Sequence, residues 1–271
     1  MSDRETRFKL TLHYDGSAFH GWQVQPGQPT VQGALEAAVS RIAGVHRTVT
    51  GAGRTDSGVH ATGQVAAVAL PGEWTSAELW RALNAVLPRA VWVRSAEPVS
   101  AAFQPRFDAL SRSYAYRVGT APEAASPFHR RWCWPLCRPL DMEAAAAAAG
   151  TILGEHEFHA FAKAGQPQRG HACKVSAAAW RPWGELGAVF EISANRFLHR
   201  MVRYLVGTMV DVALGRRSAG DMVLLLQREK GDSPLTTSPP APPEGLFLTG
   251  VEYPVSTSGT DRVKQTLHNV K

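Results

Sequence analysis

The chain contains little cysteine and no long apolar run. Its 271 residues include only Cys133, Cys137 and Cys173, and no two of these form a CxxC pair. An odd number of cysteines without such a pair favours neither a disulfide framework nor a zinc knuckle. No apolar stretch approaches the ~20 residues of a membrane-spanning helix, and residues 1–7 lack the apolar core of a secretory signal. These absences predict a water-soluble, cytoplasmic protein with reduced thiols.

Metal-binding and nucleotide-binding signatures are also missing. His156 and His159 do not have the HExxH spacing that sets two ligands on one helical face. A GxGxxG phosphate cradle would need glycine at position 56, where the chain has an aspartate that would repel phosphate. We therefore expect an activity that uses no metal and no cofactor.

Positive charge is in excess and is carried mostly by arginine. Lysine and arginine total 29 against 23 acidic residues, which gives a net charge of +6 and an isoelectric point near 9.5. Arginine makes forked contacts with phosphate, so the composition weakly favours a nucleic-acid partner. The residues expected to contact phosphates are Arg106, Arg112, Arg196, Arg200, Arg216 and Arg217.

Hydrophobic periodicity predicts the same order of elements in both halves of the chain. We expect strands at 8–14, 46–50, 64–70, 91–97, 113–118, 175–181, 188–193 and 246–253, and helices at 31–42, 76–86, 142–153, 198–214 and 218–229. Each half reads β-α-β-β-α-β, the order of a ferredoxin-like unit. This pattern predicts an α+β fold with two such subdomains, 1–105 and 106–253. Residues 254–271 are expected to form a polar, mobile tail.

The segment with the highest density of chemically informative residues is GAGRTDSGVHATGQV, 51–65. Four glycines in its first thirteen positions suggest unusual backbone dihedrals or close approach of another backbone. If the loop is extended, Arg54 and Asp56 share a side, and the guanidinium can hold the carboxylate ionised and oriented. The alternative is an Arg–Asp pair that only pins a loop.

The predicted helix 198–214 carries an apolar face and a basic face. Its apolar positions at helical spacing are Leu198, Met201, Val202, Leu205, Val206 and Met209. His199, Arg200 and Arg203 fall on another face. A stripe of this kind is commonly only a solvated surface.

Ordered motifs along most of the chain resemble the tRNA pseudouridine synthase A family. They are YDGSAFHGWQ (14–23), GRTDSGVHA (53–61), ALNAVLP (82–88), FQPRFDA (103–109), SRSYAYRV (111–118), FLHRMVRYLVGT (197–208) and APPEGLFL (241–248). The resemblance covers about residues 8–253 and implies the pseudouridine synthase fold, in which the two ferredoxin-like subdomains share an antiparallel sheet with the active-site cleft between them. Departures from the family pattern are Ser57, the Gln104–Pro105 pair and Ser113, and those in 104–113 bear on RNA contacts.

The resemblance implies roles for four residues. Asp56 matches the catalytic aspartate, Arg203 an arginine brought to that aspartate, and Tyr114 a tyrosine that packs against the target base. Because the target uridine must leave its stack, Arg54 is the candidate for filling or propping the gap. The implied substrate is the anticodon stem-loop of tRNA, at positions 38, 39 and/or 40, and the implied assembly is a homodimer.

Two other classes of protein remain as alternatives. A non-catalytic RNA-binding module would use basic and aromatic residues but would gain nothing from an Arg–Asp pair. An N-glycoside hydrolase commonly uses a second carboxylate, and none adjoins Asp56 in the sequence. For a synthase, Asp56 could stabilise the positive sugar, capture it covalently or remove a neighbouring proton.

Overall fold

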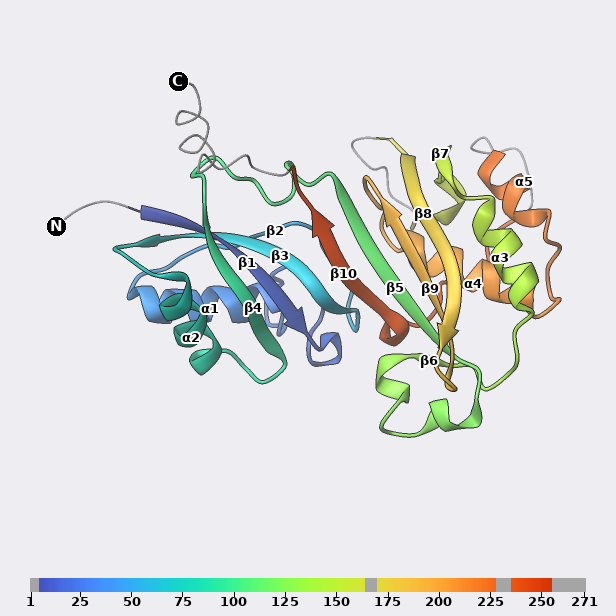
Figure 1. Ribbon diagram of the computed structural model, residues 1–271, viewed down its shortest axis with the longest axis horizontal. Coiled ribbons are helices and arrows are strands. Elements are labelled where there is room, and N and C mark those ends of the chain that lie inside the picture. The colour runs from blue at the N-terminus through green and yellow to red at the C-terminus, as the bar shows by residue number, and fades with distance from the viewer. Residues whose placement is uncertain (1–4, 164–169, 228–234, 255–271) are drawn as a thin grey trace, which may run out of the picture.

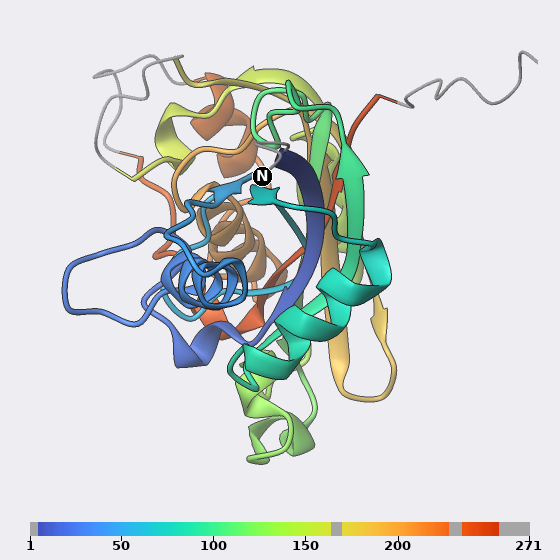
Figure 2. The same ribbon diagram turned by 90° about the vertical axis from the view of Figure 1, so that its left-hand side faces the viewer.

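The computed structural model describes residues 5–163, 170–227 and 235–254, in which ten strands form one sheet (Figure 1). The strands are β1 (Glu5–Tyr14), β2 (Thr50–Gly51), β3 (His60–Pro71), β4 (Val91–Val99), β5 (Ser111–Gly119), β6 (Trp134–Pro135), β7 (Gly154–Glu157), β8 (Ala172–Trp183), β9 (Gly187–Ala194) and β10 (Leu246–Glu252). The helices are α1 (Val31–Ala43), α2 (Ser76–Val86), α3 (Met142–Gly150), α4 (Met201–Ala213) and α5 (Asp221–Gln227). Figures 1 and 2 show α1 and α4 on the same face of the sheet.

The strand order confirms the expected α+β fold. Along the sheet the order is β4-β1-β3-β10-β5-β9-β8-β7, with β2 beside β3 and β6 beside β5. Within the first half, β4-β1-β3-β2 repeats the spatial order that β10-β5-β9-β8 has in the second. Pairing is antiparallel except where β3 meets β10 and where β5 meets β6. The assignment of 1–105 and 106–253 as subdomains stays a prediction.

The two halves meet at a short parallel ladder. His60 and Ala61 of β3 pair with Phe247 and Leu248 of β10, whereas residues further along the same edge of β3 pair with β2. The loop that joins β2 to β3 therefore emerges at the junction between the halves. That loop carries Asp56.

The expected strand at 46–50 is reduced to the two residues of β2. The backbone N–H of Val49 donates to Glu36 Oε1 at 2.9 Å, and that of Arg47 donates to Ser40 Oγ at 2.9 Å. Both acceptors lie on α1, so side chains of the helix satisfy donors that a strand would have used. The prediction of a full strand here was wrong because apolar alternation does not reveal such side-chain acceptors.

Helix α4 begins three residues later than its apolar periodicity predicted. Arg200 adopts the left-handed conformation, with φ of 63°, and α4 starts at Met201. Leu198, Met201 and Leu205 are nevertheless buried, as expected for one continuous apolar face. The turn 198–200 thus extends the apolar face of α4 beyond its first residue.

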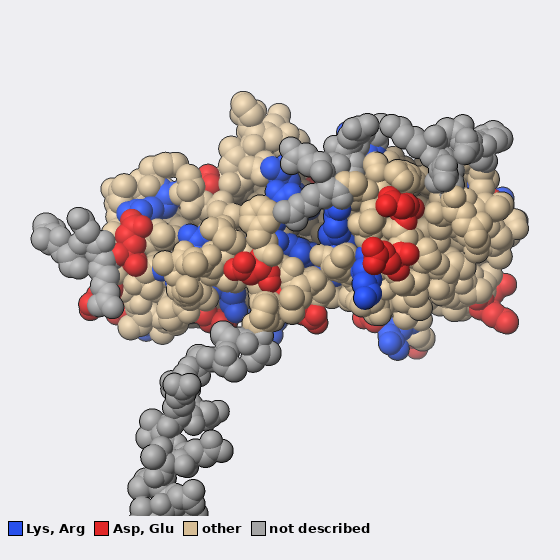
Figure 3. Space-filling view, turned by 90° about the horizontal axis from the view of Figure 1, so that it is seen from above, with Lys and Arg blue, Asp and Glu red and all other residues tan. Residues whose placement is uncertain are grey.

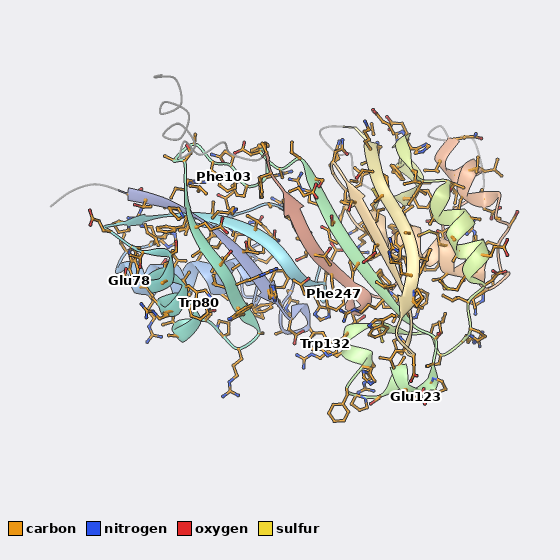
Figure 4. The ribbon with its side chains drawn as sticks, viewed as in Figure 1. Glu78, Trp80, Phe103, Glu123, Trp132 and Phe247 are labelled. Carbon is orange, nitrogen blue, oxygen red and sulfur yellow. The ribbon has the colours of Figure 1, made fainter. Side chains whose placement is uncertain are left out.

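Two apolar clusters fill the space between the sheet and the helices, one in each half. Leu10, Leu35 and Leu79 belong to the first, and Phe158 and Leu205 to the second. The starts of α1 and α2 are as expected, because Thr30 caps α1 and a capping box of Thr75 and Glu78, the latter labelled in Figure 4, opens α2.

Other expectations concern the cysteines, the membrane and the tail. All three cysteines are free, as expected. In the described ranges no helix has the length and hydropathy needed to cross a bilayer. The expected tail falls, from residue 255 onward, outside the described residues.

Candidate active site

Residues elsewhere in the first half of the chain hold the loop that carries Asp56. Its neighbour Thr55 makes a 2.8 Å side-chain hydrogen bond with the hydroxyl of buried Tyr14, and its carbonyl accepts from the N–H of Trp22 at 3.0 Å. Gln64 Nε2 donates to the carbonyl of Gly53 at 2.9 Å. These bonds fix the backbone that leads into position 56, which pre-orients the carboxylate.

Glycine is required at specific positions around the loop. Gly58 has φ of +80°, which side chains of L-residues rarely allow. At Gly63 a Cβ would lie 2.1 Å from the carbonyl oxygen of Thr249, where β10 passes β3. Gly53 has neither constraint, so glycine density overstated the requirement at that position.

Three side chains from the second half converge on the Asp56 carboxylate. Arg203 Nη1 donates to Oδ2 at 3.2 Å, His199 Nε2 lies 3.2 Å from Oδ1, and Arg200 Nε lies 3.8 Å from Oδ2. The Asp56 side chain is 23% exposed and that of Arg203 only 11%. The carboxylate is therefore held by basic groups across the junction of the halves and remains open to solvent on one side.

The turn before α4 holds these basic groups in a constrained geometry. Arg200 is one of two non-glycine residues with positive φ in the described chain, and its Nε is buried without a hydrogen-bond partner. The carbonyl of His199 accepts from the N–H of Lys163 at 3.1 Å. Strained backbone and unsatisfied polar groups commonly occur at functional sites. From the sequence, Arg200 was expected only among the phosphate contacts and His199 was assigned no role, although both lie in the same motif as Arg203.

Arg203 also ties the site to the segment that leads into β10. Its Nε donates to the carbonyl of Ala241 at 2.7 Å, and the N–H of Ala241 donates to the carbonyl of Arg203 at 2.9 Å. One guanidinium therefore bridges Asp56 and residue 241. This bridging geometry suits arginine, because its planar fork presents donors in two directions.

Tyr114 lies on β5 where the two apolar clusters meet, since it packs against both. Its ring makes an edge contact with Phe197, with centroids 5.0 Å apart. Burial raises the pKa of its hydroxyl to about 12, Arg112 opposes that rise, and the negative charge of Asp56 adds to it. The hydroxyl is therefore neutral at physiological pH, and the ring lies within electrostatic range of the carboxylate.

Arg54 does not contact Asp56 in this structure. It is exposed, and the ion pairs of Asp56 come from 199–203. The expected pairing assumed an extended loop that places both side chains on one side. Instead the Asp56 carboxylate meets the 199–203 segment, and the chain turns directly after Asp56, where the N–H of Val59 donates to the carbonyl of Asp56 at 3.2 Å.

The arginines expected to contact phosphate fall into different environments. Arg112 donates from both terminal nitrogens to four backbone carbonyls, including that of Ala52 at 3.1 Å and that of Asn195 at 3.1 Å. Arg217 pairs with Asp221 and donates to Thr236. Both guanidinium groups thus brace the fold.

The other phosphate candidates are placed differently. Arg106 and Arg216 are exposed, Arg196 is half-buried, and Arg216 pairs with Asp211 at 3.1 Å. Figure 3 shows lysine and arginine side chains gathered along the middle of the upper face. Such a concentration of positive charge suits an anionic polymer.

A second cluster, which the sequence did not reveal, surrounds His60, the first residue of β3 directly after the loop. Buried His60 accepts from the N–H of Gly16 at its Nδ1 (3.0 Å) and donates from Nε2 to the carbonyl of Arg131 (3.1 Å). Its ring stacks on Phe247 and contacts Trp132 (Figure 4). Burial lowers its pKa, so His60 is a neutral, structural imidazole at physiological pH.

The fold and the arrangement around Asp56 agree with the pseudouridine synthase class of RNA-modifying isomerases, and comparison with known proteins shows the family. The model of the tRNA pseudouridine synthase family matches residues 11–108 and 148–254. The chain therefore belongs to the tRNA pseudouridine synthase family. It is 44% identical over 262 residues to tRNA pseudouridine synthase A of Frankia casuarinae, covering 94% of this chain and 92% of that protein. It is 42% identical over 248 residues to the protein of the same name from Methylacidiphilum infernorum, covering 91% of this chain and 95% of the relative.

Proposed function

We propose that this chain converts uridine to pseudouridine in the anticodon stem-loop of tRNA and that the Asp56 carboxylate is the essential group. The observation that carries the proposal is the position of Asp56 at the junction of the halves, held by Arg203 and His199 and close to Tyr114. The names of the relatives support tRNA as the substrate.

The chemistry needs one carboxylate and no change of oxidation state. The N1–C1′ bond of uridine breaks, the uracil turns, a C5–C1′ bond forms, the C5 proton leaves to solvent, and N1 takes up a proton, so that the product is an isomer of the substrate. Positive charge develops on the sugar during cleavage, and an ionised Asp56 can stabilise it, capture it or take a neighbouring sugar proton. Each route uses the same carboxylate, so the reaction as proposed requires neither a metal nor a cofactor.

The uracil ring must leave its stack to reach Asp56. The half-buried ring of Tyr114 provides an aromatic surface within electrostatic range of the carboxylate. Arg54 is exposed on the same loop and makes no ion pair with Asp56, so its guanidinium is available to the displaced nucleotide or to the gap it leaves. Arg203 orients the carboxylate from the protein side.

The assembly and location follow from the same proposal. We propose a homodimer in which one subunit holds the body of the tRNA while the other presents Asp56, and a cytoplasmic location where tRNA is modified. Light scattering on the purified protein should give twice the chain mass. A monomer that is fully active would contradict the shared-substrate arrangement.

The decisive experiment replaces Asp56 by asparagine. Asp56→Asn keeps the shape of the side chain but removes the ionisable oxygen, so it should fold and bind tRNA without releasing tritium from tRNA labelled at uracil C5. Asp211→Asn is the matched control, because Asp211 also pairs with an arginine and its side chain is likewise 23% exposed. Circular dichroism would check that both variants fold.

The outcomes separate the proposal from its rivals. Turnover by Asp56→Asn would show that another group performs the reaction. Free uracil released by the parent protein would indicate an N-glycoside hydrolase, which the all-basic surroundings of Asp56 disfavour. tRNA binding by the parent without pseudouridine formation would indicate a non-catalytic RNA-binding protein.

A further inference from the structure

A carboxylate and two imidazoles converge at the outer edge of the second half, apart from the Asp56 site. Glu157 is the last residue of β7, His159 opens a short 3-10 helix (His159–Phe161), and His171 precedes β8. One ligand atom of each lies within 4.8 Å of the others. The rings of the two histidines are 4.0 Å apart at their centroids.

The backbone that carries these three residues is well fixed. β7 and β8 pair in antiparallel register with Glu157 opposite Ala172, and the N–H of Phe158 donates to the carbonyl of His171 at 3.1 Å. Phe158 and Phe161, which flank His159, are fully buried. The three positions are therefore held together by the fold, and convergence on a ligand requires only side-chain rotation.

The distances suit a small divalent ion. A tetrahedral zinc site with bonds of about 2.0–2.1 Å places neighbouring ligand atoms about 3.3 Å apart. His159 Nε2 already lies 3.2 Å from Glu157 Oε2, and rotation of the His171 ring can shorten the remaining separations. The His159 and Glu157 side chains are 31% and 52% exposed, so an ion can enter from solvent.

We propose that Glu157, His159 and His171 form a binding site for a divalent transition-metal ion, with Zn²⁺ as the best match and water completing the coordination. Two imidazole nitrogens and one carboxylate oxygen are a donor set that selects zinc over magnesium or calcium. Sequence spacing could not reveal the site, because β7 and β8 bring His171 beside His159 only through tertiary pairing.

The ion would act on the fold and not on the chemistry. None of the three ligands contacts Asp56, but the segment that begins at His159 continues to Lys163, whose N–H supports the carbonyl of His199. A bound ion would fix the start of that segment to the β7–β8 hairpin. The proposal therefore predicts metal-dependent stability together with a reaction that needs no metal.

The test is a metal titration of untagged protein after treatment with a chelator. Calorimetry with Zn²⁺ should give one ion per chain, and Co²⁺ should give the visible absorption of a four-coordinate complex. His159→Ala and His171→Ala should each lower Zn²⁺ affinity at least about tenfold, and Glu157→Gln should lower it as well. The matched control is His156→Ala, which removes a neighbouring imidazole that instead contacts the carbonyl of Leu153 and should leave affinity unchanged.

Thermal unfolding provides an independent readout. Zn²⁺ should raise the melting temperature of the parent and of His156→Ala, because a ligand that binds only the folded state stabilises it, and should not raise that of His159→Ala. Failure of the parent to bind Zn²⁺ would overturn the proposal. Equal affinity in the parent, His159→Ala and His171→Ala would also overturn it by placing the ion elsewhere.

Discussion

Replacing Arg203 by alanine tests whether burial makes the Asp56 ion pair important. The change removes a 3.2 Å hydrogen bond to Asp56 and a 2.7 Å bond to the carbonyl of Ala241. A hydrogen bond to a charged group contributes about 1.5–3 kcal/mol. Because water can enter the vacated space and Asp56 keeps its contacts with His199 and Arg200, we expect the free energy of unfolding to fall by about 2–4 kcal/mol.

The same change should slow the reaction. With one carboxylate oxygen no longer fixed, we expect the single-turnover rate at saturating tRNA to fall about 10–100-fold, equivalent to about 1.4–2.7 kcal/mol of activation free energy. Urea denaturation followed by circular dichroism would measure stability, and tritium release from tRNA labelled at uracil C5 would measure the rate.

An exposed arginine pair provides the control for Arg203→Ala. Arg181 pairs with Glu191 at 2.9 Å, but the two side chains are 66% and 54% exposed. Exposed pairs contribute at most about 1 kcal/mol, so Arg181→Ala should change stability little and the rate not at all. Equal losses of stability in the two variants would refute the argument from burial. An unchanged rate in a destabilised Arg203→Ala would make Arg203 a structural residue only.

Three further changes probe other parts of the molecule. Tyr114→Ala should depress the single-turnover rate at saturating tRNA and leave tRNA affinity nearly intact, because one stacked base contributes little beside many phosphates. Tyr114→Phe should restore the packing. If Tyr114→Ala weakened only tRNA binding, Tyr114 would not belong to the catalytic site. Burial lowers the pKa of His60, so below about pH 6.5 the unfolded chain takes up a proton that folded His60 does not. The free energy of unfolding should therefore fall as pH drops from that value towards the lower pKa of folded His60. Urea titrations at several pH values should show a weaker pH dependence of stability in His60→Gln, and the same pH dependence in both proteins would contradict this. Arg106→Ala should reduce the magnitude of the log–log salt slope of tRNA binding by about one unit, whereas Arg217→Ala should reduce stability and leave that slope unchanged; similar slopes in the two variants would show that exposure does not select the phosphate contacts.

Much of the fold was predictable because its signals are local. The cap at Thr30 and the capping box at Thr75 lie within one turn of the backbone groups that they satisfy. The apolar face of α4 follows from helical spacing alone and remained correct when the helix began later than predicted. Such features depend on residues a few positions apart, so a linear sequence contains the information that determines them.

Sequence patterns were less informative where a partner came from another element. The strand expected at 46–50 was reduced to Thr50–Gly51, because backbone donors of Val49 and Arg47 bond to Glu36 and Ser40 on α1. The sequence also did not reveal that the Arg112 guanidinium donates to carbonyls as far along the chain as Asn195. Nothing in the residue type or its neighbours distinguishes a guanidinium that braces a loop from one that faces solvent.

The sequence by itself determined that Asp56 lies in a glycine-rich loop, because the motif around it and the strand that follows are contiguous. Only the tertiary structure decided which groups hold the carboxylate. Arg54, two positions away, is exposed and is not among the ion-pair partners of Asp56, whereas Arg203 reaches Asp56 from 147 positions along the chain. The reason is that sequence spacing fixes side-chain direction only within one regular element, whereas contacts between elements are set by the parallel join of β3 to β10 and by the packing of α4 against the sheet.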